Sequence, residues 1–297
     1  MHRITRREFT ALAAGALAAR PALAQDEAII MRAIPHGGER LPVVGLGTAA
    51  VFADDDAATR DAATKVVRAL VVGGGRLIDT ASVYQDSETV IGKAMAATGL
   101  RDKLFIATKL EAYEGDEVLR RSLSRLQTKQ VDLLQLHNVR DPAQSLGRFR
   151  EWKAQGVCRY VGITSTYHDY FDAVEAVVKR EKPDFVQIDY SIDNRLAEER
   201  ILPAAHDAGA AVLTALPFGR ARLFGTVRGK NVPDWAAGFA GSWAQFFLKF
   251  LISDPRVTAV IPGTSDPRHM EDNLGAQRGR LPSPEERKRM AAFVAAL

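Results

Sequence analysis

Residues 76–92, RLIDTASVYQDSETVIG, contain a short strand, a polar loop and the start of a helix. RLID follows a run of glycines and is rich in long apolar side chains, which is typical of a buried strand that ends at Asp79. SETVIGKAMA then has apolar residues at helical spacing behind Ser87, which we expect to cap the helix. Tyr84 therefore lies in the short loop between the strand and the helix.

The same combination of strand and helix recurs along the chain. Apolar runs alternate with segments of helical periodicity such as 57–71 and 241–252. Continuous apolar strands separated by helices favour parallel pairing with the helices outside. Eight such units in about 250 residues predict a (β/α)8 TIM barrel of the α/β class. The predicted strands span residues 43–47, 76–79, 104–108, 131–136, 159–163, 184–188, 210–215 and 257–261.

A doubly wound open sheet is the alternative fold. GLGTAA, residues 45–50, also fits the glycine-rich turn of a dinucleotide-binding Rossmann unit, and Asp79 ends the second strand as such a unit requires. In that unit the glycine turn opens directly into a helix, whereas here VFADDD intervenes and the helix is expected near Asp56. We therefore predict one barrel domain over residues 25–297, with a hairpin turn at HGG (36–38) and a long loop over 215–235.

Residues 1–24 have the pattern of a cleavable export signal. A basic head precedes an apolar stretch from Phe9 to about Ala19, and small residues follow at 22–24. Arg6 and Arg7, with Phe9 two residues later, resemble the signature of the twin-arginine pathway, which exports folded proteins. We expect the twin-arginine export machinery to recognise the chain and to deliver it to the periplasm or another exported location.

The export signal accounts for most of the positive charge. It carries four arginines and one glutamate, a net charge of +3 out of the formal +4, which leaves +1 for the rest of the chain. A nearly neutral chain gives no reason to expect a nucleic-acid partner. No apolar run reaches the length of a membrane span. Cys158 is the single cysteine, so no disulfide can form within the chain, and we predict no metal site.

Four chemically able side chains follow three neighbouring strands. Asp79 ends the second predicted strand, and Tyr84 lies in the loop behind it. Lys109 follows the third strand, and His137 follows the fourth. Because the carboxyl ends of barrel strands meet at one face, where functional groups gather, we expect these side chains to lie together at the barrel mouth.

With these residues in place, the chain resembles the aldo/keto reductase family over residues 41–274. The resemblance implies reduction of an aldehyde or ketone by hydride from a nicotinamide cofactor held at the barrel mouth. The matching segments are GLGT (45–48), LIDTASVYQDSETVIG (77–92), IATK (106–109), SLSRLQTKQVDLLQLHN (122–138), GITS (162–165), VQIDYS (186–191) and IPGTSDPRHMEDN (261–273).

The chemistry of carbonyl reduction gives each of the four side chains a role. Reduction places negative charge on the carbonyl oxygen, so the site must supply a proton and polarise the bond. Tyr84 is the expected acid, and the ammonium of Lys109 stabilises its phenolate. Asp79 pairs with Lys109 and keeps it charged, while His137 orients the substrate oxygen through a hydrogen bond.

The resemblance places the cofactor along the later strands. Ser165 and Gln187 would bind the nicotinamide carboxamide, and Thr264 and Ser265 would hold the adenosine phosphate near a helix N-terminus. The expected cofactor is NADP(H), with NAD(H) as the alternative. Further cofactor contacts are expected from Pro217, Gly219, Arg220, Arg222, Gly263, Arg268, His269, Asp272 and Asn273.

Several positions depart from the family pattern. Thr166 stands where an asparagine is usual, and Ala215 where many members have an aromatic residue that stacks on the nicotinamide. Gly263 and His269 replace a frequent lysine and arginine, which weakens the case for NADP over NAD. The loop after GLGT also lacks a tryptophan common among relatives. The substrate pocket is predicted to include Val51, Phe52, Val83, Tyr113 and Asn138.

Two other functions stay open. A Schiff-base aldolase also uses a strand-end lysine beside an acid, although Tyr84 would then lack its proposed role. An exported cofactor-binding sensor or partner protein with little turnover is the second. The reason to consider this sensor is that an exported enzyme leaves the cytoplasmic pool of reduced nicotinamide behind.

Overall fold

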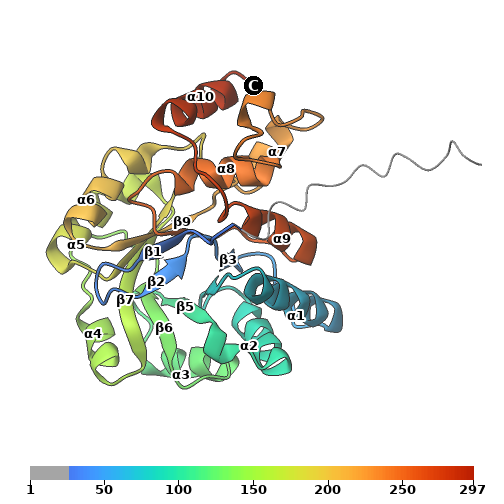
Figure 1. The fold of residues 1–297 in the computed structure, drawn as a ribbon. Helices are drawn as coiled ribbons and strands as arrows, with labels where there is room; N and C mark the ends of the chain where they lie inside the picture. Colours follow the sequence, from blue (N-terminus) through green and yellow to red (C-terminus); the bar gives the residue numbers. More distant parts are fainter. Residues whose placement is uncertain (1–26) are drawn as a thin grey trace, which may run out of the picture.

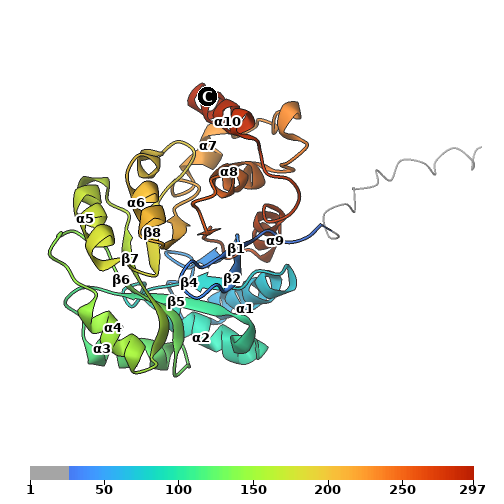
Figure 2. The same ribbon diagram turned by 60° about the vertical axis from the view of Figure 1, so that its left-hand side comes forward.

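The computed structural model describes residues 27–297 (Figure 1). The export signal predicted over residues 1–24 lies outside the described residues. At the centre is a sheet of eight parallel strands, and helices surround it (Figure 2). Within residues 27–297, no helix is both long enough and apolar enough to span a membrane.

The eight strands of the sheet pair in chain order, each parallel to the next. Each predicted strand corresponds to one of them, so the predicted (β/α)8 barrel is confirmed. The doubly wound and Rossmann alternatives are wrong, because both require the strand order to reverse. The strands are Leu46–Gly47 (β3), Leu77–Asp79 (β4), Phe105–Leu110 (β5), Val131–Leu136 (β6), Cys158–Ser165 (β7), Phe185–Asp189 (β8), Ala211–Ala215 (β9) and Ala259–Val260 (β10).

The barrel closes where the GLGT segment meets the last strand. The backbone N–H of Gly45 donates to the carbonyl of Val260 at 2.8 Å, and that of Val260 donates to the carbonyl of Val43 at 2.9 Å. A Cβ atom on Gly47 would lie only 2.7 Å from the carbonyl oxygen of Ile261. Gly47 therefore allows the close backbone approach that closes the barrel, and a Cβ atom on Gly45 would lie 2.9 Å from the carbonyl oxygen of Leu77 on β4. Close packing thus accounts for both glycines without a phosphate-binding turn.

The helices start largely where the sequence predicts. α1 begins after Asp56, whose carboxylate accepts a hydrogen bond from the backbone of Thr59 at 2.7 Å. Asp86 occupies the N-cap position of α2 without a side-chain capping bond, and Ser87 is the first helical residue, with its hydroxyl 3.2 Å from that of Thr80, so the prediction that Ser87 caps this helix is wrong. The α-helices are Ala57–Val72 (α1), Ser87–Thr98 (α2), Asp116–Arg125 (α3), Gly147–Ala154 (α4), Phe171–Glu181 (α5), Ile201–Asp207 (α6), Arg222–Thr226 (α7), Trp243–Ile252 (α8), Pro267–Gly275 (α9) and Pro284–Ala295 (α10).

A short hairpin precedes the barrel. β1 (Met31–Ala33) and β2 (Arg40–Pro42) pair in antiparallel fashion. The turn predicted at residues 36–38 lies between them, with φ angles of 103° at Gly37 and 72° at Gly38. Only glycine adopts such angles readily, so the predicted turn is confirmed with its physical reason.

The hairpin covers the amino-terminal end of the barrel. Ile34 and Leu41 have no exposed surface and belong to the apolar cluster that fills the barrel interior. Leu77, Phe105 and Phe185, each the first residue of its strand, belong to the same cluster. One end of the barrel is thus closed by apolar packing, which leaves the carboxyl ends of the strands for chemistry.

The long loop predicted over 215–235 contains the short helix α7. In both views α7 lies beside α8 and the carboxyl-terminal helix α10 (Figures 1 and 2). The loop after β9 is therefore held against neighbouring helices, and the aromatic ring of Phe224 in α7 packs 4.8 Å from Phe218 and 6.0 Å from Phe247, between ring centres.

Gly92 provides a test of the packing between α2 and α3. A Cβ atom at Gly92 would lie 2.1 Å from the carbonyl oxygen of Arg125. Alanine is favoured over glycine inside a helix by about 1 kcal/mol. We nevertheless expect Gly92→Ala to lower the free energy of unfolding by about 1–3 kcal/mol, because the two helices must move apart.

The matched control is Gly225→Ala in α7, where no atom lies within 4 Å of the added Cβ. This variant should be neutral or slightly stabilising. Urea denaturation of both variants measures the difference, and a Gly92→Ala protein as stable as the parent would show that the helices do not pack as described.

Candidate active site

The four side chains predicted at the barrel mouth lie together. Asp79 ends β4, and Lys109 on β5 donates from Nζ to its Oδ2 at 2.5 Å. Tyr84, in the loop after β4, has its ring centre 4.9 Å from the same Nζ atom. His137 directly follows β6, and its ring meets that of Tyr84 edge to face with 5.8 Å between ring centres. Three neighbouring strand ends thus bring these groups within reach of one small ligand.

The Asp79 carboxylate is the centre of a buried network. Asp79 and Lys109 are 2% and 1% exposed. The amide of Gln187 on β8 donates to Asp79 Oδ2 at 3.2 Å, and the amide of Gln135 on β6 donates to Oδ1 at 3.3 Å. Lys109 also donates to the carbonyl of Thr80 at 2.7 Å. A buried ion pair needs such additional hydrogen bonds, and here they come from Gln135 and Gln187 on two further strands and from the carbonyl of Thr80 just after β4.

This network keeps Lys109 charged. Burial by itself lowers the pKa of Lys109, but the Asp79 carboxylate and the Tyr84 oxygen outweigh it, so the pKa is raised above the ordinary value for lysine. A Schiff-base aldolase needs the uncharged amine as its nucleophile. The charge on Lys109 therefore argues against the aldolase alternative and suits an ammonium that stabilises a phenolate.

His137 is a neutral imidazole at neutral pH. Burial, together with the charges of Lys109 and Arg140, lowers the pKa of His137 to about 3. Its Nδ1 atom lies 2.9 Å from Oε1 of Glu111. This Nδ1 atom is buried, and within residues 27–297 it has no aligned hydrogen-bond partner. A neutral imidazole carries a single N–H, so the nitrogen that bears it decides whether His137 can donate to a ligand oxygen.

The residues predicted to bind the nicotinamide fit that ligand. Ser165 ends β7 and Gln187 lies on β8, and both are buried. Gln187 uses its amide nitrogen on Asp79, while its carbonyl oxygen Oε1 is buried and has no partner among residues 27–297. An unsatisfied buried acceptor costs about 1–3 kcal/mol, and the N–H of a carboxamide would satisfy it. The site thus has an acceptor of the kind that nicotinamide needs.

The predicted contacts of the adenosine phosphate gather between β10 and α9. Asp266 caps α9, accepts from the backbone of Arg268 at 2.9 Å and pairs with its guanidinium at 2.7 Å. The backbone of Asp266 donates to the hydroxyl of Thr264 at 3.1 Å. A phosphate bound here would therefore have to share Arg268 with a carboxylate. The other predicted residues of this segment are Gly263, Ser265, His269, Asp272 and Asn273.

The predicted cofactor residues after β9 lie in the loop that contains α7. Arg222 pairs with Asp193, in the loop after β8, at 2.6 Å, so its guanidinium joins two loops. Arg220 is exposed, whereas Pro217 and Gly219 are buried. A contact between Arg222 and the cofactor stays a prediction, and it would compete with the Asp193 pair.

The predicted substrate-pocket residues differ in their surroundings. Phe52 has no exposed surface and packs in the core between the sheet and the helices, so the prediction that it forms a pocket wall is wrong. Val51 and Asn138 are half-buried, while Val83 is 45% and Tyr113 is 85% exposed. These four residues are accessible to a ligand, and their part in substrate binding stays a prediction.

Two residues of the site, Gln135 and Glu111, were not predicted from the sequence. Gln135 reaches Asp79 from the middle of the apolar strand VDLLQL, and the argument that singled out Gln187 applies to it equally. Glu111 lies two residues beyond Lys109, and its contact with His137 joins two different loops. A carboxylate in a loop is usually solvated, so the sequence contains no signal for this contact.

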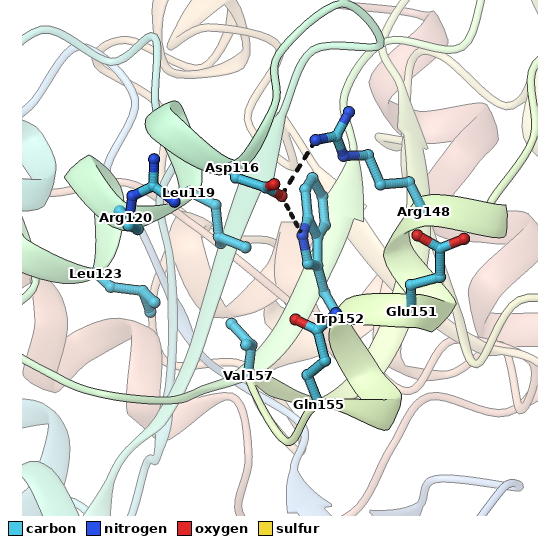
Figure 3. A pocket seen from close by; sticks show the side chains of 9 residues that line it. All are labelled: Asp116, Leu119, Arg120, Leu123, Arg148, Glu151, Trp152, Gln155 and Val157. Carbon is cyan, nitrogen blue, oxygen red and sulfur yellow. Dashed lines mark hydrogen bonds and ion pairs between the residues drawn. The ribbon is translucent and has the colours of Figure 1, made fainter.

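Other candidate ligand sites lie away from the mouth. Figure 3 shows a surface cavity of about 410 Å3 between α3 and α4. There Asp116 accepts from Trp152 Nε1 at 2.8 Å and pairs with Arg148 at 3.1 Å, so its charged groups satisfy one another. This cavity is therefore better explained by helix packing than by a ligand. Within residues 27–297, no three His, Cys, Asp or Glu side chains are grouped to hold a metal ion.

The fold and the mouth residues together define a (β/α)8 barrel with a buried acid and amine beside a phenol and an imidazole. The sequence profile of the Aldo/keto reductase family matches residues 43–294, so the chain belongs to that family and is an NAD(P)H-dependent oxidoreductase.

Known relatives resemble the chain over most of its length. Methylglyoxal reductase YeaE of Escherichia coli (strain K12) is 30% identical over 262 residues, which cover 84% of this chain and 90% of that protein. Methylglyoxal reductase DkgB of Escherichia coli O157:H7 is 29% identical, with coverages of 85% and 93%. The crystal structure of an aldo-keto reductase from Klebsiella pneumoniae in complex with NADPH matches with a TM-score of 0.75 at 25% identity, over 90% of this chain and 96% of that chain.

Lys109→Met tests the buried ion pair. This variant leaves the Asp79 carboxylate buried without its cation, so we expect the free energy of unfolding to fall by about 3–5 kcal/mol. The double variant Asp79→Asn, Lys109→Met buries no charge and should recover much of that loss. Denaturant titration of the two proteins at one pH measures both values.

Lys93→Met is the matched control, because Lys93 pairs with Asp55 at a similar distance of 2.5 Å but is partly exposed. It should change stability much less. Equal losses for the Lys93 and Lys109 variants would show that burial does not strengthen the Asp79 pair.

Proposed function

We propose that this chain reduces an aldehyde or ketone to an alcohol, with NADP(H) as the expected cofactor ahead of NAD(H). The observation that carries the proposal is the buried Asp79–Lys109 pair beside the ring of Tyr84, with the His137 ring packed edge to face on that of Tyr84. This arrangement places a proton donor, a charge that stabilises its conjugate base and a hydrogen-bonding imidazole at one strand-end site.

Each side chain has a distinct part in the reaction. A nicotinamide cofactor held by Ser165 and Gln187 would supply hydride for the carbonyl carbon. Tyr84 then donates its phenolic proton to the carbonyl oxygen as negative charge develops there. The Lys109 ammonium stabilises the resulting phenolate, and Asp79 holds that ammonium in place. His137 orients the carbonyl oxygen by a hydrogen bond.

The chain's own groups support a nicotinamide cofactor. The unpaired Oε1 of Gln187 and the buried hydroxyl of Ser165 suit the carboxamide. The Klebsiella pneumoniae relative is described as a complex with NADPH, which favours NADP(H) for this chain as well. Gly263 and His269, which replace a frequent lysine and arginine, keep NAD(H) open as the alternative.

The relatives suggest where to look for a substrate. Two of them are named methylglyoxal reductases, so methylglyoxal and other small aldehydes are the first compounds to test. The alternative of a cofactor-binding sensor predicts cofactor binding without oxidation when these aldehydes are added, and one titration separates the two functions.

Tyr84→Phe tests the proton donor. Loss of a general acid should lower the rate of aldehyde reduction by about 10²–10⁴-fold. Cofactor binding, followed by nicotinamide fluorescence, should be retained because the ring stays in place. The rate is measured as NADPH oxidation after addition of methylglyoxal.

Tyr170→Phe is the matched control, because Tyr170 ends the short 3-10 helix after β7, is 37% exposed and belongs to none of the predicted sites. It should reduce aldehydes as fast as the parent. A Tyr84→Phe variant with undiminished activity would show that the proton comes from another group.

We also propose that the chain is exported by the twin-arginine pathway to the periplasm or its equivalent. The support is the sequence of residues 1–24, with Arg6 and Arg7 ahead of an apolar stretch. This pathway accepts folded proteins, so the chain could leave the cytoplasm with its cofactor already bound. Recycling of the oxidised cofactor would then need a partner reaction outside the cytoplasm.

The double substitution Arg6→Lys, Arg7→Lys tests this route. We expect the full chain to remain in the cytoplasmic fraction, because the pathway reads the arginine pair and not the charge alone. Cell fractionation followed by immunoblotting measures the distribution. Arg3→Lys, in the same signal but outside the pair, should be exported normally, and equal export of both variants would contradict the proposal.

A further inference from the structure

Glu111 lies against the Nδ1 side of the His137 ring. Glu111 is the first residue after β5, and its Oε1 is 2.9 Å from Nδ1 of His137. Nδ1 is buried, and the contact has the distance but not the alignment of a hydrogen bond. A modest rotation of the glutamate side chain would align it.

The backbone fixes the position of Glu111. Its own N–H donates to Oε2 of Glu114 at 2.8 Å, and the hydroxyl of Ser82 donates to the same oxygen at 2.8 Å. The backbone N–H of His137 donates to the carbonyl of Leu110 at 2.8 Å. Glu111 and His137 are therefore held side by side by the pairing of β5 with β6, and their contact does not depend on a flexible loop.

The proton on Glu111 decides what His137 can do. An ionised Glu111 accepts from Nδ1–H, and the neutral imidazole then presents only a lone pair at Nε2. A protonated Glu111 donates to Nδ1, and the single N–H of the imidazole then lies on Nε2. Only the second form can donate a hydrogen bond to the oxygen of a carbonyl substrate.

We propose that Glu111 is a positioning residue that, in its protonated form, holds Nδ1 of His137 and so fixes the N–H on Nε2 toward the substrate oxygen. This inference rests on the proposed reductase function. Glu111 itself touches neither the carbonyl nor the cofactor in this scheme, and it acts through His137 alone.

Burial and a neighbouring carboxylate shift Glu111 toward its protonated form. Burial raises the pKa of the Glu111 carboxyl and so does the nearby Glu114, although Asn138 and Arg140 lower it, and the net shift is upward. His137 cannot take the proton instead, because burial and the charges of Lys109 and Arg140 oppose the imidazolium. The remaining titratable group that faces the pair is Tyr84, whose ring packs on His137.

A pH dependence follows. Glu111 is protonated below its raised pKa and ionised above it, so kcat/KM for a neutral aldehyde should decrease as the pH rises through that pKa. Glu111→Gln carries a permanent amide N–H that can donate to Nδ1 at every pH. This variant should retain the activity of the parent at low pH and should lose the decrease at higher pH.

Two further variants separate this role from general effects of charge and packing. Glu111→Leu leaves Nδ1 without a partner and should lower kcat/KM by about tenfold or more at every pH, as expected when the orienting partner of a functional histidine is removed. Glu114→Gln removes a neighbouring negative charge but keeps an acceptor oxygen, and it should keep the pH-dependent decrease of the parent.

The imidazole can be observed without turnover. In the parent protein labelled with ¹⁵N-histidine, the His137 resonances should show that the N–H is on Nε2 at low pH and moves to Nδ1 as the pH rises. In Glu111→Gln, they should show the N–H on Nε2 at every pH. The chain has six histidines, so the resonances of His137 must be assigned. They are the signals that disappear from the spectrum of the His137→Gln variant. A parent protein and a Glu111→Gln variant with the same tautomer and the same pH profile would overturn the proposal.

Because the resonance measurement needs neither substrate nor cofactor, it also separates two kinds of failure. The expected tautomer change in a protein that does not reduce aldehydes would refute the reductase function and leave the Glu111–His137 coupling standing. Reduction of aldehydes with no tautomer change would refute only the role of Glu111.

Discussion

The buried ion pair of Asp79 and Lys109 is the constraint on which the rest of the mouth depends. Its carboxylate also takes hydrogen bonds from Gln135 and Gln187, so groups on four strands meet at one pair of oxygen atoms. A strand shifted by one residue would turn its polar side chain to the outside of the barrel and leave a charge buried without its partners. The network therefore specifies the strand register as well as supporting the chemistry.

The pKa values of Lys109 and His137 are shifted in opposite directions. Asp79 and the Tyr84 oxygen outweigh burial and raise the pKa of Lys109, whereas burial lowers the pKa of His137 and the Lys109 ammonium lowers it further. One site thus holds a permanently charged group beside a neutral imidazole, and the two can serve different ends: the ammonium stabilises a developing phenolate, and the imidazole hydrogen-bonds without competing for the proton. Environments that push the pKa values of neighbouring groups apart are typical of acid and base catalysis.

The sequence predicted the barrel and the four mouth residues because both depend on local patterns. A strand end can be located from its apolar run, and parallel strands bring their carboxyl ends to one face whatever the rest of the chain does. Glu111 escaped prediction because its contact with His137 depends on the direction of a side chain across two strands. Ser87 and Phe52 were wrong for a related reason: each is buried against residues distant in sequence, which a local pattern cannot show.

The GLGT segment shows how one local pattern can serve two folds. In a Rossmann unit such glycines let the backbone approach a pyrophosphate, whereas here Gly47 lets it approach the last strand, with 2.7 Å between its added Cβ and the carbonyl of Ile261. The requirement for glycine is the same in both cases, a close approach that a side chain would block. Only the partner differs, and the partner is set by strand order over the whole chain. The glycine motif therefore indicates that the backbone comes close to another group. The number of strand and helix units decides whether that group is a pyrophosphate or another strand.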